Sequence, residues 1–448
     1  MTTAISPPPN APLRIGIAGL GTVGASVLRI LRRRENALAD RCGRAIRVTA
    51  VSARDRTRDR GIDLGGLSWF DDPVALAASP EIDCLVELVG GSDGPAKAAV
   101  EAALSAGKPV VTANKALLAH HGVALAELAE ANGVALAFEA SSAGGIPVVK
   151  TLREALAGNT VTRLYGILNG TCNYILSRME LEGLTFEACL KDAQRLGYAE
   201  ADPTFDVEGF DTAHKLAILT SLAFGTKIDS EAIHVEGISS IAPLDLKMAD
   251  ELGYRIKLLG VAERTKTGIE QRVHPTMVPK SSAIAQVMGV TNAVTIDADA
   301  VREITLVGPG AGGDPTASAV VADIADVARG VAGQPFGLPV ARLEVAARAP
   351  MQRHEGGYYI RLAVADRPGA AAAIATRMAE ADISLESIVQ RRSEAAAQRD
   401  PSGRSGAPVP VVLITYATSE AAIRAALEKV TADGHVAEAP QVIRIERE

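Results

Sequence analysis

The chain has 448 residues, a formal charge of −7, and 48% hydrophobic against 22% charged residues. This length predicts about three domains, and this balance is typical of a soluble globular protein. The negative charge argues against broad binding of nucleic acid, and no run of residues is long and apolar enough to predict a membrane span.

The N-terminal residues and the cysteines bear on the cell compartment. Residues 1–12 contain a proline run and lack the basic start and long apolar stretch of a secretion signal, so we expect a disordered leader. The spacing of the cysteines fits neither a disulfide framework nor a zinc site. The cysteines are Cys42, Cys84, Cys172 and Cys189. Together these features predict a cytoplasmic protein.

Residues 13–145 alternate between short apolar strands and alanine-rich helices. We expect strands at residues 13–19, 45–53, 82–90, 108–114 and 134–140. Such alternation is typical of a parallel sheet that is covered by helices on both faces. The sequence therefore predicts an α/β fold whose N-terminal domain is a doubly wound, Rossmann-type parallel sheet.

A glycine-rich loop follows the first expected strand and opens the first helix. It fits the pattern G-x-G-x-x-G and consists of Gly19, Leu20, Gly21, Thr22, Val23 and Gly24. In such a loop the first glycine permits a tight turn, the second lets the backbone approach a pyrophosphate, and the third allows close helix–strand packing. The helix N-terminus favours phosphate groups. We expect a dinucleotide site here rather than a merely structural glycine turn.

The end of the second expected strand bears on the choice of cofactor. An NAD-selective site usually places an acidic residue there, on the ribose 2′-hydroxyl. Here Arg54 comes first and Asp55 follows it. A guanidinium group suits a 2′-phosphate, so we expect NADP(H) to be preferred through Arg54, with NAD(H) possible through Asp55. A solvated basic loop is the alternative.

The rest of the chain divides into two further units and a linker. Residues 146–314 mix amphipathic helices with strands, which predicts an α+β substrate domain. A long helix at about 315–332 follows, and residues 333–355 form a linker with prolines and glycines. Residues 356–448 have the element order βαββαβ, which is typical of a ferredoxin-like unit. We expect that unit to be separate.

An acidic segment at residues 197–216 carries the strongest chemical signal. Its carboxylates are Glu200, Asp202, Asp206, Glu208 and Asp211. Asp211 and Lys215 are four residues apart, which places them on one face of a helix. The alternatives are an exposed ion pair beside a solvated acidic loop and a calcium loop, but the calcium-loop pattern is not present.

Three polar segments accompany the acidic one. Lys115 ends the sequence Thr-Ala-Asn-Lys just past an expected strand, where parallel sheets present their ligand crevice. Residues 169–173 form a polar turn before a helix, and residues 308–313 form a second glycine-rich loop. Each of these alone is also consistent with an ordinary turn or helix cap.

Taken in this order, the motifs resemble homoserine dehydrogenase over the whole chain past the leader. They are GLGTVG, TANKALLA, FEASSAGGIPVV, GILNGTCNYIL, LGYAEADPTFDVEGFDTAHKLAIL and GPGAGGDPTASAVVADI. No aspartokinase domain precedes them, so the resemblance is to the monofunctional form, and residues 356–448 resemble an ACT domain. The resemblance implies reversible NAD(P)H-dependent reduction of L-aspartate 4-semialdehyde to L-homoserine, on the route to threonine, methionine and isoleucine.

The resemblance also assigns roles to individual residues. It implies catalytic roles for Lys215, Lys115 and Asp211, with Lys115 near the nicotinamide and the substrate. Substrate binding would fall to Glu200, Asp206 and Asp211, since carboxylates suit the ammonium group of homoserine. Gly197 and Gly312 would join the cofactor site. Lys215, as an ammonium, would donate a proton to the forming alkoxide, and Asp211 would favour its charged form.

Further implications concern a cation, an effector and assembly. Family members bind a monovalent cation, typically sodium, in the segment that matches Glu139 and the carbonyl groups of Ser142, Gly144 and Ile146, and hard oxygen ligands suit it. Many relatives have valine where Ser142 stands, which a backbone ligand tolerates. An ACT domain implies a small amino-acid effector, here L-threonine. We expect a homo-oligomer, a dimer or tetramer, with residues 146–314 as the dimerisation domain and residues 315–332 completing the Rossmann domain.

Two other functions remain open at this stage. A non-catalytic amino-acid sensor predicts loss of the proton-handling residues, yet Lys215, Asp211, Glu200 and Lys115 are all present. Another Rossmann oxidoreductase acting on a small carbonyl acid is the second. A phosphorylating semialdehyde dehydrogenase, for example, needs a nucleophilic cysteine, for which Cys172 is the one candidate and which we interpret as structural.

Overall fold

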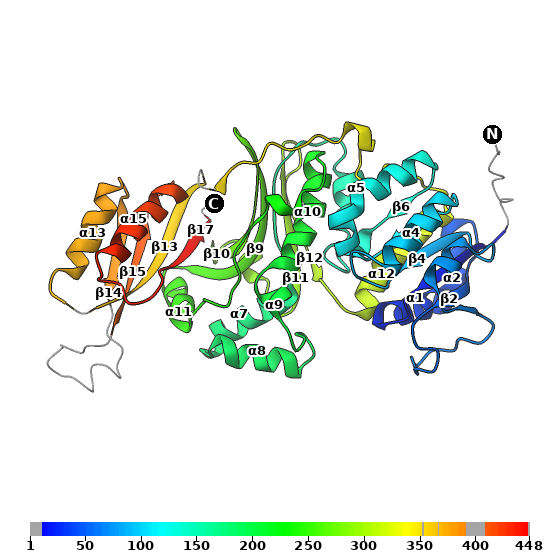
Figure 1. Cartoon of the computed structure of the whole chain (residues 1–448), viewed down its shortest axis with the longest axis horizontal. Coiled ribbons are helices and arrows are strands. Elements are labelled where there is room, and N and C mark those ends of the chain that lie inside the picture. Colours follow the sequence, from blue (N-terminus) through cyan, green and yellow to red (C-terminus); the bar gives the residue numbers. More distant parts are fainter. Residues whose placement is uncertain (1–10, 352–353, 366, 391–407, 447–448) are drawn as a thin grey trace.

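The computed structural model describes residues 11–351, 354–365, 367–390 and 408–446. Three parts follow one another along its longest axis: the N-terminal domain, a central domain and the C-terminal unit (Figure 1). Most of the expected leader, and all but the last residue of the polar segment 394–408, lie outside the described residues.

The N-terminal domain is built on a parallel sheet with the strand order β3-β2-β1-β4-β5-β6. The strands are β1 (Leu13–Ala18), β2 (Ile46–Ser52), β3 (Ser68–Phe70), β4 (Cys84–Glu87), β5 (Val110–Thr112) and β6 (Leu136–Ala137). Every residue of β4 and β5 is buried, because helices cover both faces of the sheet. This order, which reverses beside β1, confirms the predicted Rossmann-type sheet.

Helices from both ends of the sequence cover this sheet. The first five are α1 (Thr22–Arg33), α2 (Glu35–Cys42), α3 (Pro73–Ala78), α4 (Pro95–Ser105) and α5 (Lys115–Ala131), and α12 (Gly313–Ala328) returns from far along the chain. Val320 and Ile324 of α12 are buried in the same apolar core as Val27 and Leu28 of α1. The N-terminal domain is therefore completed by a helix that follows the central domain in sequence.

The crossover from the N-terminal to the central domain differs from the expectation. Strand β6 has only two residues and passes into a short 3-10 turn, η1 (Glu139–Ser141), where a strand at 134–140 was expected. The reason is that the Glu139 carboxylate accepts hydrogen bonds from the backbone N–H groups of Val149 and Lys150 at 2.9 and 2.8 Å. The chain then forms a short helix, α6 (Val148–Lys150), and a π-helical turn, η2 (Thr151–Ala155), rather than one continuous α-helix.

The central domain is an antiparallel sheet with helices packed against it. Its strands follow the order β12-β11-β7-β9-β10. They are β7 (Val161–Ile167), β9 (Tyr254–Thr265), β10 (Gly268–Pro279), β11 (Thr291–Ala298) and β12 (Arg302–Pro309), and the short β8 (His234–Val235) pairs with β10. The helices are α7 (Gly170–Glu182), α8 (Phe186–Arg195), α9 (Thr204–Val207), α10 (Phe210–Phe224) and α11 (Pro243–Glu251). Helix α10 packs against β7, β9 and β10, which holds its polar end beside the N-terminal domain (Figure 1).

The C-terminal unit has the predicted βαββαβ order, but it is not separate from the rest. Its elements are β13 (Glu355–Val364), α13 (Ala370–Glu380), β14 (Leu385–Gln390), β15 (Val409–Thr415), β16 (Thr418–Ser419), α15 (Glu420–Ala432) and β17 (Gln441–Ile445). The strand order β17-β13-β15-β14 confirms the ferredoxin-like arrangement. Strand β17 also pairs in parallel with β10, with Arg444 opposite Thr276. One sheet therefore runs from the central domain into this unit, contrary to the expectation of a free-standing domain.

Candidate active site

The glycine loop has the shape that a bound pyrophosphate needs. Gly19 has φ of 99°, and a side chain there would overlap the carbonyl of Leu88. A side chain at Gly24 would overlap the carbonyl of Gly19, so α1 begins close to β1. Gly21 faces open space and caps α1 without a side-chain hydrogen bond. The first N–H groups of α1 are therefore free for an anionic ligand, and the residues present fit a dinucleotide.

The second glycine-rich loop lies against the first. A Cβ at Gly313 would come within 2.8 Å of the Ser26 hydroxyl and 3.0 Å of Thr22. Gly312 precedes it with φ of 116° and caps α12. The structure thus brings residue 312, expected in the cofactor site, next to the turn at residues 19–24. Gly197, which was expected there too, is exposed at the C-terminal end of α8.

In the loop after β2, Asp55 and Arg60 are engaged in hydrogen bonds, whereas Arg54 is exposed. Asp55 is occupied locally: its Oδ1 accepts hydrogen bonds from the Thr57 N–H and hydroxyl groups at 2.8 and 2.7 Å. Those bonds lower the pKa of Asp55. The Arg60 guanidinium donates to the Leu20 carbonyl at 3.1 Å, which ties this loop to the glycine loop. Arg54 is exposed, and its guanidinium makes no hydrogen bond or ion pair with the described residues.

Two lysines meet on one buried carboxylate. Lys215 Nζ lies 2.7 Å from Asp211 Oδ2, and Lys115 Nζ lies 2.6 Å from Asp211 Oδ1. Asp211 and Lys215 share a face of α10, as their spacing predicts, and Lys115 is the first residue of α5, just past β5. Lys215 also donates to the carbonyl of Leu168 at 2.6 Å. Both lysines are thus held at the crevice between the N-terminal and central domains.

Asn169 joins a second carboxylate to this cluster. Its Nδ2 donates to Asp206 Oδ1 and to Asp211 Oδ2, each at 2.8 Å. Its Oδ1 accepts from the Cys172 N–H at 2.8 Å and so caps α7. The sequence indicated a cap at residues 169–173 but did not single out Asn169. An asparagine that caps a helix with Oδ1 keeps its NH2 group free to donate elsewhere.

The surroundings of the cluster lower the pKa of Lys215. Burial lowers the pKa of Lys215, and the charge of Lys115 lowers it further, although Asp211 acts in the opposite direction. Burial alone raises the pKa of Asp211, but Lys215 and Lys115 outweigh it and hold that pKa well below its usual range. Burial, with Asp211 nearby, raises the pKa of Asp206. Asp211 thus favours the charged form of Lys215, as expected, but burial acts in the opposite direction and has the larger effect.

Glu200 is not part of the cluster in this structure. It is exposed, and its backbone carbonyl accepts a hydrogen bond from Gln194 Nε2 at 3.0 Å. The neighbouring Tyr198 carbonyl accepts from the Thr171 hydroxyl at 2.6 Å, which keeps this segment beside the start of α7. The structure thus brings Lys115, Asp206, Asp211 and Lys215 together but leaves Glu200 at the rim.

Cys172 lies against the same cluster but is unsuited to nucleophilic attack. Its side chain is fully buried, and its Sγ donates to the carbonyl of Asp206 at 3.2 Å. Burial raises the pKa of the thiol well above its ordinary value, and nearby Asp206 adds to the effect. Because the thiolate is the nucleophile, this position disfavours phosphorylating semialdehyde chemistry.

The segment expected to bind sodium is buried between the domains. Glu139 is 1% exposed, and its own N–H donates to Asp323 Oδ2 at 2.8 Å. The Ile146 carbonyl accepts from the Val148 N–H at 2.8 Å. The Ser142 hydroxyl is buried with no hydrogen-bond partner in the structure. The described residues contain no group of three or more His, Cys, Asp or Glu side chains arranged to hold a metal ion.

Known protein families match all three parts of the chain. Residues 19–139 match the homoserine dehydrogenase NAD-binding domain, residues 147–325 match the homoserine dehydrogenase domain, and residues 358–432 match the ACT domain. Within the described residues, no helix has the length and apolar character that a membrane crossing requires.

Proteins named homoserine dehydrogenase are similar to nearly the whole chain. Homoserine dehydrogenase of Pseudomonas aeruginosa is 44% identical and that of Mycobacterium tuberculosis 40%, covering 97% and 98% of this chain and 99% of each relative. The crystal structure of the Thiobacillus denitrificans enzyme superposes with a TM-score of 0.90, at 43% identity, over 98% of this chain and 99% of that one. A hyperthermophilic archaeal homoserine dehydrogenase in complex with NADPH superposes with a TM-score of 0.62 at 25% identity, over 72% of this chain and 99% of that one. The chain therefore belongs to the homoserine dehydrogenase family and is an oxidoreductase with an NAD(P)-binding Rossmann domain and a C-terminal ACT domain.

Proposed function

We propose that the chain catalyses the reversible NAD(P)H-dependent reduction of L-aspartate 4-semialdehyde to L-homoserine, in the biosynthesis of threonine, methionine and isoleucine. The observation that carries this proposal is the pair of lysines on Asp211 at the mouth of the cofactor crevice. The direct test is oxidation of NADPH by aspartate semialdehyde without added phosphate. Phosphate-dependent reduction of NADP+ by the semialdehyde would instead indicate a phosphorylating dehydrogenase, because that reaction oxidises the aldehyde to an acyl phosphate.

Different side chains serve the proton transfer, the stabilisation of charge and the binding of the substrate. Bound NAD(P)H supplies the hydride. Lys215, held by Asp211 and the Leu168 carbonyl, donates its proton to the oxygen that becomes the homoserine hydroxyl. Lys115 places a second positive charge near the same oxygen, which stabilises its developing negative charge. Asp206 and Asp211 offer carboxylates to the substrate ammonium group, and Glu200 joins them only if its segment closes over the substrate.

The two directions of the reaction should differ in their dependence on pH. Oxidation of homoserine needs neutral Lys215, because the amine accepts the hydroxyl proton, whereas reduction needs the ammonium. An ordinary lysine titrates near ~10.4, and burial lowers the pKa of Lys215. We therefore expect the oxidation rate to rise and the reduction rate to fall as pH increases through a pKa below ~10.4. The prediction is checked by measuring kcat for oxidation and for reduction as a function of pH up to about 10.4. Identical pH profiles in the two directions would contradict the role of Lys215.

Arg54 is proposed to read the 2′-phosphate of NADPH, which makes NADP(H) the preferred cofactor and leaves NAD(H) possible. Its exposed guanidinium at the end of β2 supports this role. Loss of a charge-assisted hydrogen bond costs about 1.5–3 kcal/mol, so Arg54→Ala should raise the KM for NADPH about tenfold or more and leave the KM for NADH nearly unchanged. Arg47→Ala, an exposed arginine near the start of the same strand, is the matched control. Equal losses for both cofactors would exclude Arg54 from this role.

A sodium ion, an effector and a dimer complete the proposed function. The buried Glu139 and the unpartnered hydroxyl of Ser142 are compatible with a hard monovalent cation held by Glu139 and the carbonyls of residues 142, 144 and 146.

L-Threonine is proposed as the effector of the ACT domain, beside Gly369, which has φ of 88° and caps α13. Asp366, three residues before Gly369, lies outside the described residues. The central domain, whose β12 leaves Val307 57% exposed, is proposed as the contact between two chains.

A further inference from the structure

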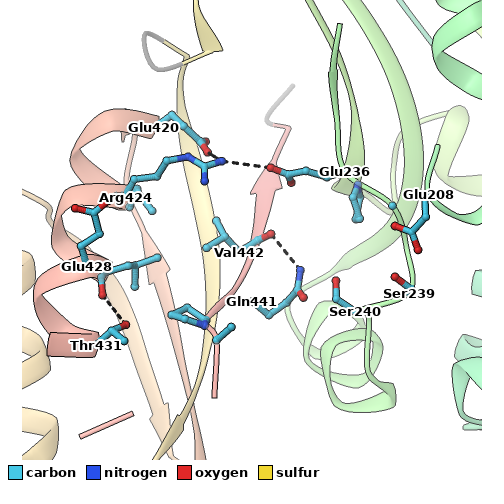
Figure 2. Close-up of a pocket in the computed structure, with 16 residues that line it drawn as sticks. Glu208, Glu236, Ser239, Ser240, Glu420, Arg424, Glu428, Thr431, Gln441 and Val442 are labelled. Atoms are coloured by element: carbon cyan, nitrogen blue, oxygen red, sulfur yellow. Dashed lines mark hydrogen bonds and ion pairs between the residues drawn. The ribbon is translucent and has the colours of Figure 1, made fainter. Parts of the chain in front are cut away.

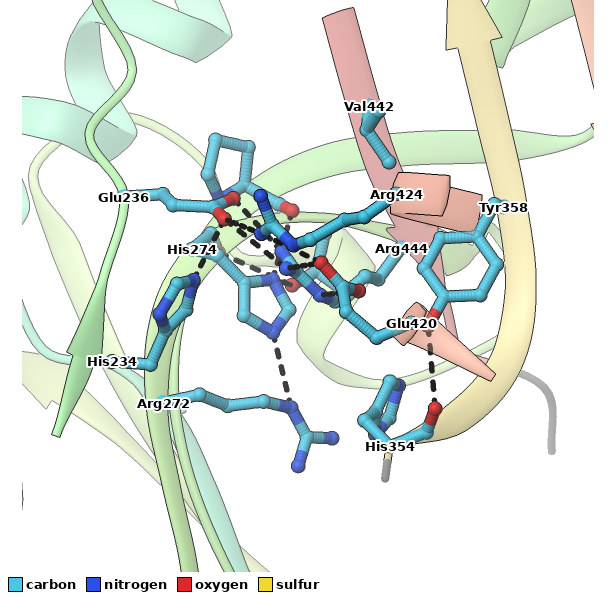
Figure 3. A network of polar contacts seen from close by, with 12 residues as sticks. His234, Glu236, Arg272, His274, His354, Tyr358, Glu420, Arg424, Val442 and Arg444 are labelled. Atoms are coloured by element: carbon cyan, nitrogen blue, oxygen red, sulfur yellow. Dashed lines mark hydrogen bonds and ion pairs between the residues drawn. The ribbon is translucent and has the colours of Figure 1, made fainter. Parts of the chain in front are cut away.

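Buried lysine and arginine side chains in the described part of the chain are paired with carboxylates, with one exception. These side chains are Lys215, Lys257, Arg272 and Arg444. Arg444 lies 2.8 Å from Glu236 and 2.8 Å from Glu420 (Figure 3). Arg272 and Lys215 lie 3.0 and 2.7 Å from carboxylates of their own. Lys257 is the exception, since it forms no ion pair with any described residue.

A cavity of about 790 Å³ between the central domain and the ACT domain is lined by part of the paired network. Glu236, Glu420 and Arg424 lie on its wall (Figure 2). Arg424 lies 2.7 Å from Glu420 and 3.3 Å from Glu236. These charges neutralise one another within the chain and need no ligand. The buried charge without a carboxylate lies elsewhere, at Lys257 in β9.

The ammonium group of Lys257 is held by polar groups of α7 and of residues 287–288. The side chain is 1% exposed. Its Nζ lies 2.6 Å from the Val287 carbonyl oxygen, 3.0 Å from Asn173 Oδ1 and 3.4 Å from Met288 Sδ. A buried ammonium costs free energy unless its hydrogen bonds are made, and the three N–H donors of a lysine match three acceptors here. Lys257 is therefore satisfied by neutral groups alone.

The same contacts fasten the 287–292 segment, which runs into the start of β11, to helix α7. Asn173 Nδ2 donates to the Val287 carbonyl at 3.2 Å and to the Thr291 carbonyl at 3.1 Å. The Val287 carbonyl therefore accepts hydrogen bonds from both Asn173 and Lys257. We call Lys257, Asn173 and the Val287 carbonyl the lysine clamp. The clamp joins β9, α7 and the 287–292 segment at one point.

The 287–292 segment packs against two loops of the active site. A Cβ at Gly170, the first residue of α7, would lie 2.6 Å from the Val290 carbonyl oxygen. A Cβ at Gly310, in the second glycine-rich loop, would lie 2.0 Å from Asn292 Nδ2. Asn292 is 1% exposed, and its side chain has no hydrogen-bond partner among the described residues, so its contact with Gly310 is one of packing. The segment therefore spaces the start of α7 from the cofactor loop.

The start of α7 also carries the side chain that orders the carboxylates of the active site. Asn169 caps α7 one turn before Asn173. It donates to Asp206 and to Asp211, each at 2.8 Å. A shift of this end of the helix therefore moves both carboxylates that are proposed to bind the substrate ammonium group.

We propose that Lys257 is a positioning residue for the reaction: it holds the 287–292 segment against α7, and the segment sets the separation between the turn at residues 169–173 and the glycine loop at residues 308–313. Lys257 itself touches neither substrate nor cofactor. The kinetic consequence rests on the proposed function, whereas the clamp rests on the hydrogen bonds of the folded chain.

The strength of the clamp should depend on pH. Burial lowers the pKa of Lys257 to about 8. Glu180 of α7 raises this pKa, but Arg255, which lies 2.8 Å from Glu180, lowers it again. Lys257 is therefore an ammonium below pH 8 and an amine above it. Because hydrogen bonds from a charged donor are about twice as strong as neutral ones, the clamp weakens as pH rises through this pKa.

The test compares homoserine oxidation by the full-length protein and by Lys257→Met at pH values below and above 8. Below it, the KM for homoserine should be about tenfold higher in the variant, because hydrogen bonds to a charged group are lost, with a smaller change in kcat. The ratio of the two KM values should fall above it, since only the unchanged protein loses a charge. The titrations of Lys215 and of the substrate cancel in this ratio. A ratio that stays constant with pH indicates packing alone and overturns the proposal.

Two further variants keep this result interpretable. Lys247→Met removes an exposed lysine of α11 and should leave the KM unchanged at each pH. The Gly289 N–H donates to the Ser177 hydroxyl of α7 at 3.1 Å. Ser177→Ala therefore removes one tie of the segment without a titrating group, and should raise the KM about twofold or more by a factor that does not vary with pH.

The remaining outcomes separate the clamp from the proposed function. An unchanged KM in folded Lys257→Met overturns the clamp, and so does an unchanged KM in Ser177→Ala if circular dichroism shows Lys257→Met to be unfolded. If the unchanged protein oxidises no homoserine, the proposed function is wrong, and hydrogen exchange then tests the clamp alone. The Gly289 amide should exchange faster in Lys257→Met, or in Ser177→Ala if the first variant is unfolded, and an unchanged exchange rate overturns the proposal.

Discussion

Replacing Lys215 with alanine is expected to reduce turnover by about 10²–10⁴-fold, the usual contribution of a positioned acid–base group. Lys215 donates hydrogen bonds to both Asp211 and the Leu168 carbonyl. Among the described residues, no other side-chain nitrogen contacts both of these groups. Substrate and cofactor should still bind, because their proposed contacts are with other residues. The measurement is kcat in both directions, with cofactor binding followed by fluorescence titration.

Two comparisons separate the chemistry of Lys215 from a loss of folding. Lys227→Ala removes an exposed lysine just past the end of α10 and should leave kcat unchanged. A small primary amine added to Lys215→Ala should restore part of the activity, because the vacated space can admit another proton donor. Near-normal turnover in a folded Lys215→Ala protein would remove this residue from the mechanism.

Replacing Asp211 with asparagine is expected to affect both stability and activity. Asp211 is 3% exposed, and its single negative charge is shared by the ammonium groups of Lys115 and Lys215. Removing one partner of a buried ion pair costs about 3–5 kcal/mol, because the remaining charge is left unpaired. Turnover should also fall steeply, since Lys215 loses the group that orients it. The free energy of unfolding by urea and kcat for oxidation are the two measurements.

A double variant tests whether the cost comes from the unpaired lysines. Lys115→Met combined with Asp211→Asn should recover part of the lost stability, because one of the two ammonium groups is then absent. Asp40→Asn, an exposed position on α2, serves as the control and should change stability by less than about 0.5 kcal/mol. If Asp211→Asn is as stable as the unchanged protein, the three side chains are not electrostatically coupled as the distances indicate.

Features that depend only on neighbouring residues could be predicted from the sequence alone. The alternation of apolar strands and helices determined the Rossmann-type sheet, because helices on both faces require buried strands. The glycines at 19 and 24 determined the turn and the close approach of α1, because any larger side chain would overlap backbone atoms. The four-residue spacing of Asp211 and Lys215 determined their contact, since helix geometry alone places them on one face.

Contacts between distant segments were decided by the tertiary structure. Asn169 meets Asp211 from 42 residues away, and Lys115 reaches it from another domain. Neither distance follows from periodicity, because it depends on how α5 and α10 pack across the domain crevice. Glu200 stands only eleven positions before Asp211 in the acidic segment, yet the turn at residues 197–201 leaves it exposed. Proximity to Asp211 in the sequence therefore did not predict which residues lie beside it in the site.

The C-terminal unit shows the same division most clearly. Its own sequence determined the βαββαβ order, because each element has its own apolar pattern. The pairing of β17 with β10, and that of Arg444 with Glu236 208 residues away, were decided only in the folded chain. A strand edge offers unpaired N–H and C=O groups to any neighbour, and the sequence of β17 does not say which neighbour it meets.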